Sequence, residues 1–528
     1  MKTYIKAIIF LNAFVLVSFF AAVKNVGAAP GVYYVDKDSI GGACSDSAAG
    51  TLITAPWCSI GKAASTLAAG DTVYIRAGTY YEQITPSNSG SPGSPVTYAR
   101  YGGETVIIDG STAITGWSQY SGNVYSASVT VTPNDKFTAA GYNCTNNYGG
   151  LVMQDGVKLN YCMATGIGGV DTVGKYFMND SGGCSAGSPC TLYVYLRDIG
   201  SKGYNPDNYE MRVGVKRNGF DLNNGSDYLI FDGLEIRRSE DNGIHSIGAT
   251  NITIRNCRFY GHHTTGVYLT AASDNTLIEL NEFWDNDHAG IEYWGSSGGM
   301  IRRNRFKKVD LGNGYGGNGA HIYLGGLGSS GNWVSNTTVE NNLAYDTSSN
   351  YGSAGGIQIR GNNNTVYHNT VYKSKLSGLA LVEGANNTYK NNIVYNDGSE
   401  NMGVIAVFAA AVAAGGNIFS NNDIYTLKAT SAYYWNGTFY DTLAAWEAAS
   451  GQSGNISSDP LFVDLANRDF HLTASSPAVN FGVNVGVTTD YAGATRPVDA
   501  EYDIGAYEYV STTFDTTPPA APTGIRVD

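Results

Sequence analysis

The stretch NITIRNCRFYGHHTTGVYLTAASDNTLIELNEFWDNDHAGIEYW, residues 251–294, contains two copies of one pattern. Each copy has a short apolar run, then a tetrapeptide that ends in phenylalanine (NCRF, 256–259; LNEF, 280–283), and then a glycine followed by alternating apolar residues (GVYL, 266–269; GIEY, 290–293). A repeat this short, with β-branched alternation and no room for a helix, indicates a solenoid of short strands and turns, one coil for each repeat.

The tetrapeptide recurs five more times, at RNRF, ENNL, HNTV, KNNI and NNDI, as far as residue 424. When the copies are aligned on their last apolar residue, asparagine fills six of the seven positions two residues earlier. This column is Cys257, Asn281, Asn304, Asn341, Asn369, Asn391 and Asn422. Equivalent residues in stacked coils lie about 4.8 Å apart, so we expect the asparagine amides to hydrogen-bond from coil to coil. Cys257 replaces one rung with a small buried group.

A second column begins with a glycine in each repeat. Because alternate strand residues point to opposite sides of a sheet, the residue two positions after the glycine faces solvent. The predicted outward column is His245, Tyr268, Glu292, His321, Gln358 and Ala380. The parallel column two residues on is Ile247, Thr270, Trp294, Tyr323, Arg360 and Val382.

These columns predict a saccharide-binding groove, because aromatic rings stack on sugar rings and titratable groups move protons. The expected catalytic residues are His245, Tyr268, Glu292 and His321. The expected substrate-binding residues are His263, Trp294, Tyr323, Gln358 and Arg360. Elimination in a uronate polymer would use such groups, with calcium or Arg360 neutralising the carboxylate.

Two alternatives remain open at this point. Hydrolysis needs two carboxyls that flank the bond, and Glu292 with Asp287 or Asp285 is the nearby set, although both aspartates also fit simple turn formation. A non-catalytic surface protein that binds glycans is the other alternative.

The asparagine-laddered coils resemble the right-handed parallel β-helix repeats of the pectate lyase superfamily. Segments between residues 33 and 80 resemble the start of secreted polysaccharide-active β-helix proteins, with residues 56–69 as an amphipathic helix that covers the first coil. Segments between residues 459 and 508 resemble a closing module called choice-of-anchor Q. The implied fold class is all-β, a single right-handed parallel β-helix with an N-terminal capping helix and a β-rich insertion.

The sequence DHAGIEYW, residues 287–294, is similar to the D-D-G-F-D-x-W calcium-binding coil of family 9 pectate lyases. Gly290 and Trp294 match that pattern. His288 and Ala289 stand in place of its acidic pair, and Glu292 stands in place of the following aspartate. Calcium is the cofactor that the resemblance implies, and the catalytic lysine of that family has no match here, since Lys375 lies in a later coil without the matching context.

Composition and end signals complete the prediction. With 15 % charged residues, 43 % hydrophobic residues and a net charge of −13, the chain is neither disordered nor suited to binding nucleic acid through phosphates. Residues 1–28 have the pattern of a signal peptide, so we expect a secreted monomer without a membrane span that acts on an extracellular polysaccharide. The expected segments are 29–116 (cap and first coils), 117–215 (β-rich insertion), 216–430 (central coils), 431–510 (last coils and closing module) and 511–528 (linker).

Seven cysteines follow the signal segment, an odd number. In an oxidising compartment this number predicts three disulfides and one free thiol. Proximity pairs Cys44 with Cys58, Cys144 with Cys162 and Cys184 with Cys190, because each pair brackets a short loop. Cys257 is then the free thiol.

Overall fold

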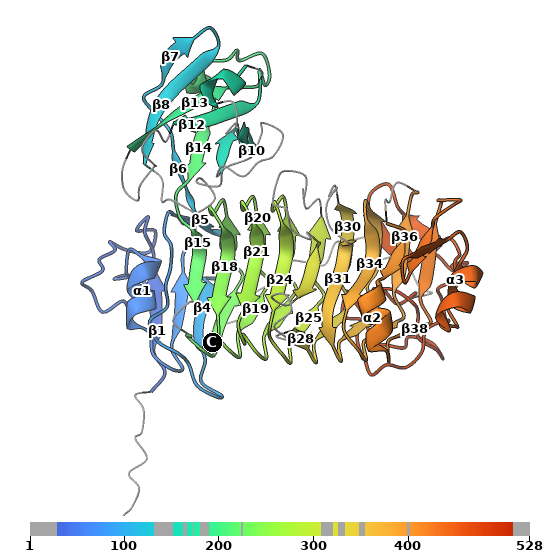
Figure 1. The fold of residues 1–528 in the computed structure, drawn as a ribbon. Helices are drawn as coiled ribbons and strands as arrows, with labels where there is room; N and C mark the ends of the chain where they lie inside the picture. Colours follow the sequence, from blue (N-terminus) through green and yellow to red (C-terminus); the bar gives the residue numbers. More distant parts are fainter. Residues whose placement is uncertain are drawn as a thin grey trace, which may run out of the picture.

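The computed structural model describes residues 29–130, 151–161, 166–171, 173–179, 189–222, 225–307, 320–325, 333–347, 354–398 and 402–510. Within these residues the chain winds into a parallel β-helix, which confirms the predicted all-β solenoid (Figure 1). Two of its sheets have 11 strands and the third has 10, and each central coil contributes one strand to each of the three. The predicted signal peptide (1–28) and linker (511–528) lie outside the described residues.

The three sheets are called I, II and III here, and within a coil the chain passes from sheet I to sheet III and then to sheet II. Sheet I contains β1 (Val32–Val35), β2 (Thr72–Ile75), β4 (Val96–Arg100), β16 (Leu229–Asp232), β19 (Thr253–Arg255), β22 (Leu277–Glu279), β25 (Met300–Arg302), β29 (Thr338–Glu340), β32 (Thr365–Tyr367), β35 (Thr388–Lys390) and β38 (Ile418–Ser420). Sheet II contains β15 (Asn218–Leu222), β18 (Asn242–Ile247), β21 (Thr265–Thr270), β24 (Ala289–Trp294), β27 (Ile322–Gly325), β31 (Ala354–Asn362), β34 (Ser377–Glu383), β37 (Ile405–Val407), β40 (Tyr433–Trp435) and β41 (Thr438–Tyr440), with β28 (Val334–Ser335) beside β31. Sheet III contains β3 (Gly78–Tyr80), β5 (Val106–Asp109), β17 (Glu235–Arg237), β20 (Arg258–Tyr260), β23 (Glu282–Trp284), β26 (Arg305–Lys307), β30 (Leu343–Thr347), β33 (Thr370–Ser374), β36 (Ile393–Asn396) and β39 (Asp423–Thr426).

An asparagine ladder runs inside the solenoid where sheet I turns into sheet III. Each rung accepts hydrogen bonds from the backbone N–H and the Nδ2 of the rung before it, at 2.9–3.1 Å. The rungs are Asn281, Asn304, Asn342, Asn369, Asn392, Asn422 and Asn455. Cys257 is a free, buried thiol whose N–H donates to Asn281, so it takes one rung as predicted.

Two predicted rungs are wrong by one residue, because Asn342 and Asn392, not Asn341 and Asn391, stand in the ladder. The alignment on the last apolar residue failed at Leu343 and Ile393. These side chains do not join the core inside the coils but pack in clusters with the C-terminal module, together with Phe470 and Leu472 respectively. An outward position that another module covers thus has the same apolar character as an inward one.

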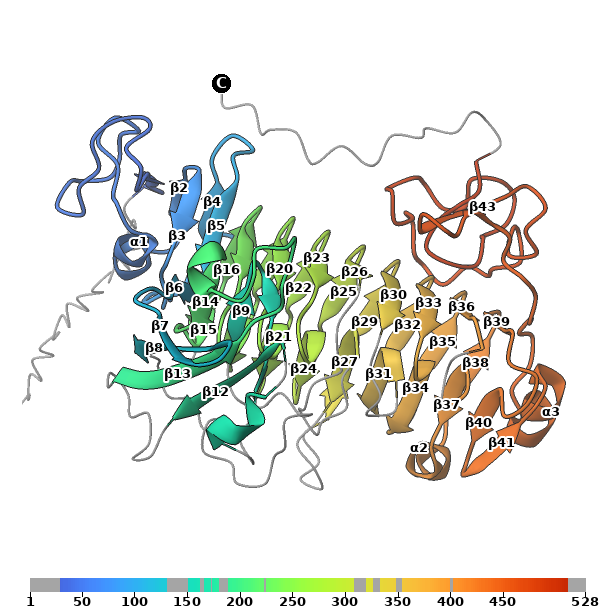
Figure 2. The same cartoon turned by 90° about the horizontal axis from the view of Figure 1, so that it is seen from above.

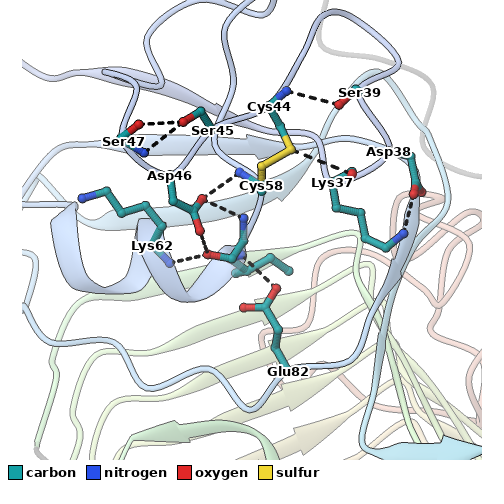
Figure 3. The surroundings of a disulfide bond; sticks show 12 residues. Lys37, Asp38, Ser39, Cys44, Ser45, Asp46, Ser47, Cys58, Lys62 and Glu82 are labelled. Carbon is teal, nitrogen blue, oxygen red and sulfur yellow. Dashed lines mark hydrogen bonds and ion pairs between the residues drawn. A yellow bond between two sulfur atoms is a disulfide. The ribbon is translucent and has the colours of Figure 1, made fainter.

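The N-terminal end of the solenoid is closed by helix α1 (Ile60–Thr66), which is shorter than predicted because Ser59 caps it. Ser59 Oγ accepts from Lys62 N and donates to Asp46, whose carboxylate also binds the N–H of Cys58 (Figure 3). The disulfide between Cys44 and Cys58 joins the same loop to the helix start, which confirms that predicted pair. Cys190 is also in a disulfide, whereas Cys144, Cys162 and Cys184 lie outside the described residues.

The other end carries α2 (Ala409–Ala414) beside β34 and α3 (Leu443–Ser450), which covers the last coil with the buried Trp446 (Figure 1). After α3 the chain returns along sheet III. There β42 (Phe462–Asp464) and β43 (Asp469–Leu472) pack on β30, β33 and β36 (Figure 2). The resemblance of this segment to choice-of-anchor Q stays a prediction.

The interruption between β5 and β15 folds as two antiparallel or mixed sheets beside the first coils, as Figures 1 and 2 show. One contains β7 (Ser118–Ser121), β8 (Val124–Thr130), β11 (Asn160–Tyr161), β12 (Lys175–Asn179) and β13 (Pro189–Tyr195). The other contains β6 (Ser111–Ala113), β9 (Val152–Gln154), β10 (Val157–Lys158) and β14 (Met211–Gly214). This insertion has its own core, in which Tyr176, Leu192 and Val213 are buried.

Candidate functional site

An outward column of polar and aromatic side chains crosses six consecutive strands of sheet II. Strand pairing in register places these residues on adjacent coils, about 4.8 Å apart. The column is Asp221 (β15), His245 (β18), Tyr268 (β21), Glu292 (β24), Tyr323 (β27) and Gln358 (β31). The structure therefore brings together five predicted site residues, His245, Tyr268, Glu292, Tyr323 and Gln358, and adds Asp221. The prediction that this column faces solvent is wrong for most of it, because His245, Glu292, Tyr323 and Gln358 are buried.

The predicted place of His321 in this column is wrong. Ile322 pairs with Ile291, so His321 stands level with Gly290, on the inner side of the coil. Its ring lies 5.7 Å from Phe306, and its Nε2–H donates to the carbonyl of Tyr345 at 3.1 Å. Burial lowers the pKa of His321 to about 3, so the imidazole is neutral at physiological pH. His321 therefore has a structural role. The prediction placed it outside the coil because the repeat was aligned two residues out of register at this strand.

Trp294 and Arg360 keep their predicted place in the second outward column, while Tyr323 moves to the first. The indole of Trp294 meets the rings of Tyr268 and Tyr323 edge to face, with centroids 6.0 and 5.6 Å away. Arg360 follows Gln358 by two residues on β31. Gln358 is fully buried, and among the described residues neither of its amide atoms has a hydrogen-bond partner. Within the same residues Trp294 Nε1 and Arg360 Nε likewise have none.

Glu292 is held by two neighbours. Thr265 Oγ1, on the preceding coil, donates to Glu292 Oε1 at 2.5 Å, and His288 Nδ1 hydrogen-bonds the same oxygen. Glu292 and His288 are 5 % and 7 % exposed, so this carboxylate–imidazole pair is recessed below the surface. A histidine bonded to a carboxylate is an arrangement that takes up and returns protons. Its spacing, four residues within one coil, was a signal that the sequence analysis missed.

His245 lies on the coil before that of Tyr268, and the two rings stack with an angle of 8° and centroids 5.3 Å apart. On its other side, His245 Nδ1 is 3.9 Å from the carboxylate of Asp221. Asp221 also escaped the sequence analysis, although it stands one coil before His245 in the same strand position.

Both carboxylate oxygens of Asp287 are engaged by neighbouring side chains. One carboxylate oxygen accepts from Lys158 Nζ at 2.6 Å, and the other accepts from His263 Nδ1 at 3.3 Å. The charges of Lys158 and His263 outweigh the opposing effect of burial and hold the pKa of Asp287 below its usual range. Asp287 therefore stays ionised and cannot serve as the general acid of a hydrolytic pair. Nothing in the sequence pointed to Lys158, because it comes from the insertion.

The donor set of a calcium ion does not fit this coil. In the part of the chain that the structure describes, no group of three or more histidine, cysteine or acidic side chains is placed to hold a metal. Asp287 is occupied by Lys158 and His263, Glu292 is bonded to His288, and Ala289 has no donor. We derive no chemical step through calcium.

The three parallel sheets and the asparagine ladder define the class of protein. The chain has the right-handed parallel β-helix fold of the pectate lyase-like proteins. The family model of the right-handed beta helix region matches residues 211–342, which contain most of the site. No helix of the described residues is long and apolar enough to cross a membrane.

The chain is 24 % identical over 464 residues to the uncharacterized protein YwoF of Bacillus subtilis, with 80 % of this chain and 88 % of that protein aligned. It is 47 % identical over 79 residues to the pectate lyase PEL9 of Emericella nidulans, which is 15 % of this chain and 18 % of that enzyme. A solved structure titled "Glycoside hydrolase" superposes with a TM-score of 0.53 at 12 % identity, covering 81 % of this chain and 96 % of that one, and shows the shared fold.

Proposed function

We propose that this chain is a secreted enzyme that cleaves an acidic, uronate-containing polysaccharide by β-elimination. The observation that carries the proposal is the outward column of sheet II, in which the recessed pair of Glu292 and His288 is flanked by the phenols of Tyr268 and Tyr323. The local similarity to a pectate lyase supports the substrate class. Secretion is supported by the signal-like segment 1–28 and by the disulfide between Cys44 and Cys58.

The proposed chemistry needs one base, one acid and one cation. The pair of Glu292 and His288 takes the proton from C5 of a uronate residue, beside its carboxylate. The electron pair left on C5 forms the double bond to C4 as the C4–O bond breaks. Tyr268, whose ring is stacked on His245, returns a proton to the leaving oxygen. Arg360 faces the uronate carboxylate and stabilises the charge that develops at C5.

Elimination suits this site better than hydrolysis. A hydrolase needs one carboxyl that is protonated and a second that is not. Asp287, one of the two nominated partners, has a lowered pKa and both oxygens engaged. Asp221, the other carboxyl of the column, lies three coils away from Glu292. Trp294 and Tyr323 supply ring surface for the sugar units on either side.

The test is to incubate the purified protein with a panel of uronate polymers and neutral glycans. Ultraviolet absorbance reports the unsaturated product of elimination, and a reducing-end assay reports any cleavage. We expect both signals on at least one uronate polymer. Reducing ends without ultraviolet absorbance would instead show a hydrolase, and binding without either signal would show a glycan-binding protein.

The matched variants are Glu292→Gln and Glu501→Gln, which each remove one carboxylate. Glu292→Gln should lower kcat by about a hundredfold or more while the circular dichroism spectrum and Tm stay close to those of the wild type. Glu501, exposed on the C-terminal module, serves as the control and should leave kcat unchanged. Full activity in Glu292→Gln would contradict the proposed site.

A further inference from the structure

The ammonium group of Lys158 lies in a cage of three oxygen atoms on the solenoid. Lys158 belongs to β10 of the insertion, yet its Nζ is 2.9 Å from the carbonyl oxygen of His262, 3.0 Å from that of Asp285 and 2.6 Å from Asp287 Oδ1. The two carbonyls come from the turns of adjacent coils, so one side chain spans two coils. The side chain of Lys158 is 18 % exposed and that of Asp287 is 9 % exposed.

The cage matches an ammonium group in number and in charge. A lysine head has three N–H donors, and each of the three oxygens accepts one of them. Carbonyl and carboxylate oxygens are also the ligands that hard divalent cations prefer. A cation therefore already occupies the oxygen-rich turn that precedes β24, and it is a covalent part of the chain.

The cage lies directly beside the proposed proton-transfer pair. Asp287, which carries the charged ligand of the cage, is followed in the chain by His288, which bonds Glu292. The second oxygen of Asp287 accepts from His263. By fixing the Asp287 carboxylate, Lys158 therefore helps to hold both His263 and the neighbouring His288 in place. In addition, Arg197 Nη1 donates to the carbonyl of Lys158 at 2.9 Å, which anchors β10 within the insertion.

We propose that Lys158 is the resident cation of this coil: it takes the position of a divalent metal, makes the site independent of calcium, and couples the insertion to the His288–Glu292 pair as a positioning residue. The effect on turnover rests on the proposed function, whereas the occupancy of the cage by Lys158 does not. The insertion then has a role in the site besides its own packing.

The experiment compares the full chain with Lys158→Ala and with Lys202→Ala. Lys202 is the matched control, because it forms a more exposed ion pair, with Asp155 of the same insertion at 2.9 Å. Wild-type Tm should be the same in EDTA and in calcium. Lys158→Ala should lower Tm by about 5 °C, because it leaves Oδ1 of the buried Asp287 carboxylate without its cationic partner, while Lys202→Ala should change Tm by less than about 1 °C.

The emptied cage should then bind an added cation. Calcium or methylammonium chloride should raise the Tm of Lys158→Ala but not that of the wild type or of Lys202→Ala. If the chain is an active lyase, Lys158→Ala should lower kcat about tenfold, and the same salts should restore part of it. If the chain proves inactive on every polymer, the Tm comparison still decides whether Lys158 fills a cation site.

Two results would overturn the proposal. One is a calcium-induced rise in the wild-type Tm that Asp287→Asn abolishes, because the coil would then hold a metal despite Lys158. The other is a Lys158→Ala variant that matches Lys202→Ala in Tm and shows no response to added cations. Should Lys158→Ala fail to fold, the first measurement, which uses the wild type and Asp287→Asn, remains decisive.

Discussion

Glu292 on β24 lies directly opposite Tyr323 on β27, in register across two adjacent coils of sheet II. Both side chains are nearly buried, and the indole of Trp294 closes against the tyrosine ring with centroids 5.6 Å apart. The carboxylate that is held by His288 and Thr265 therefore has a phenol as its outward neighbour on the next coil.

This pairing predicts a difference between Tyr323 and its near neighbour in sequence, His321. Tyr323→Phe removes the hydroxyl group of the residue that pairs with Glu292 on the next coil and should raise KM about fivefold, the equivalent of about 1 kcal/mol, with little change in kcat. His321→Gln changes a side chain inside the coil and should leave both constants as they are. Steady-state kinetics on a cleaved polymer measure this, and a larger loss in His321→Gln would place the imidazole at the reacting groups after all.

The sequence predicted the solenoid well, because the residues that define the repeat face the interior of the coils. Phe259 and its equivalents stack inside the coils, and the asparagine rungs bond to one another and to the backbone. The site was harder to predict. The strand β27 follows a long interruption of the repeat, so the position of Gly319 no longer fixed the register, and His321 replaced Tyr323 in the predicted column.

The remaining members of the site depend on contacts that no local pattern encodes. Lys158 reaches Asp287 from 129 residues away, through the insertion. Asp221 precedes the first glycine of the predicted column and so was not aligned with it. His288 was compared with a calcium-binding pattern, in which it counted as a missing ligand. In the fold it is the partner of Glu292.

The ladder predicts a large cost for one asparagine and a small cost for another. Asn342 is fully buried, and its amide bonds Asn304, Asn369 and the carbonyl of Ile301. Asn342→Ala leaves these buried groups without partners and should lower the free energy of unfolding by about 3 kcal/mol. Asn363 is exposed with φ of 56°, which glycine adopts freely, so Asn363→Gly should change it by less than about 0.5 kcal/mol. Denaturant titration measures both, and equal stabilities would contradict the ladder's role.

The buried histidines predict that acid destabilises the fold. The pKa of His321 is about 3 in the folded chain and about 6.5 in the unfolded chain, so below about pH 6.5 the unfolded state binds a proton that the folded state excludes. The stability is fully present above about pH 6.5 and falls by about 1.4 kcal/mol for each pH unit below it, until the folded pKa is reached. His262, with a pKa also lowered to about 3 by burial, acts in the same direction.

His321→Gln isolates this contribution. A glutamine Nε2 donates to the carbonyl of Tyr345 as the neutral imidazole does, but it does not titrate. The Tm of the variant should therefore fall less than that of the wild type between about pH 6.5 and about pH 5. Differential scanning calorimetry over this range gives the comparison, and parallel curves for the two proteins would mean that His321 titrates normally in the folded state.

Asp423 predicts the opposite dependence on pH. It is fully buried at the start of β39, where Oδ1 accepts from Ser458 N and Oδ2 has no hydrogen-bond partner in the part of the chain that the structure describes. Burial raises the pKa of Asp423 from 3.8 to about 7, so the folded chain retains a proton that the unfolded chain has lost. This carboxyl contributes most to stability below about pH 4, and its contribution falls as the pH rises towards 7.

Asparagine has the shape of the protonated acid and does not titrate. Asp423→Asn should therefore match the wild type in Tm near pH 4 and exceed it increasingly up to about pH 7, by about 1.4 kcal/mol in unfolding free energy for each pH unit. Glu501→Gln, which alters an exposed carboxyl, should show no such divergence, and a constant offset between Asp423→Asn and the wild type at every pH would mean that Asp423 is ionised in the folded protein.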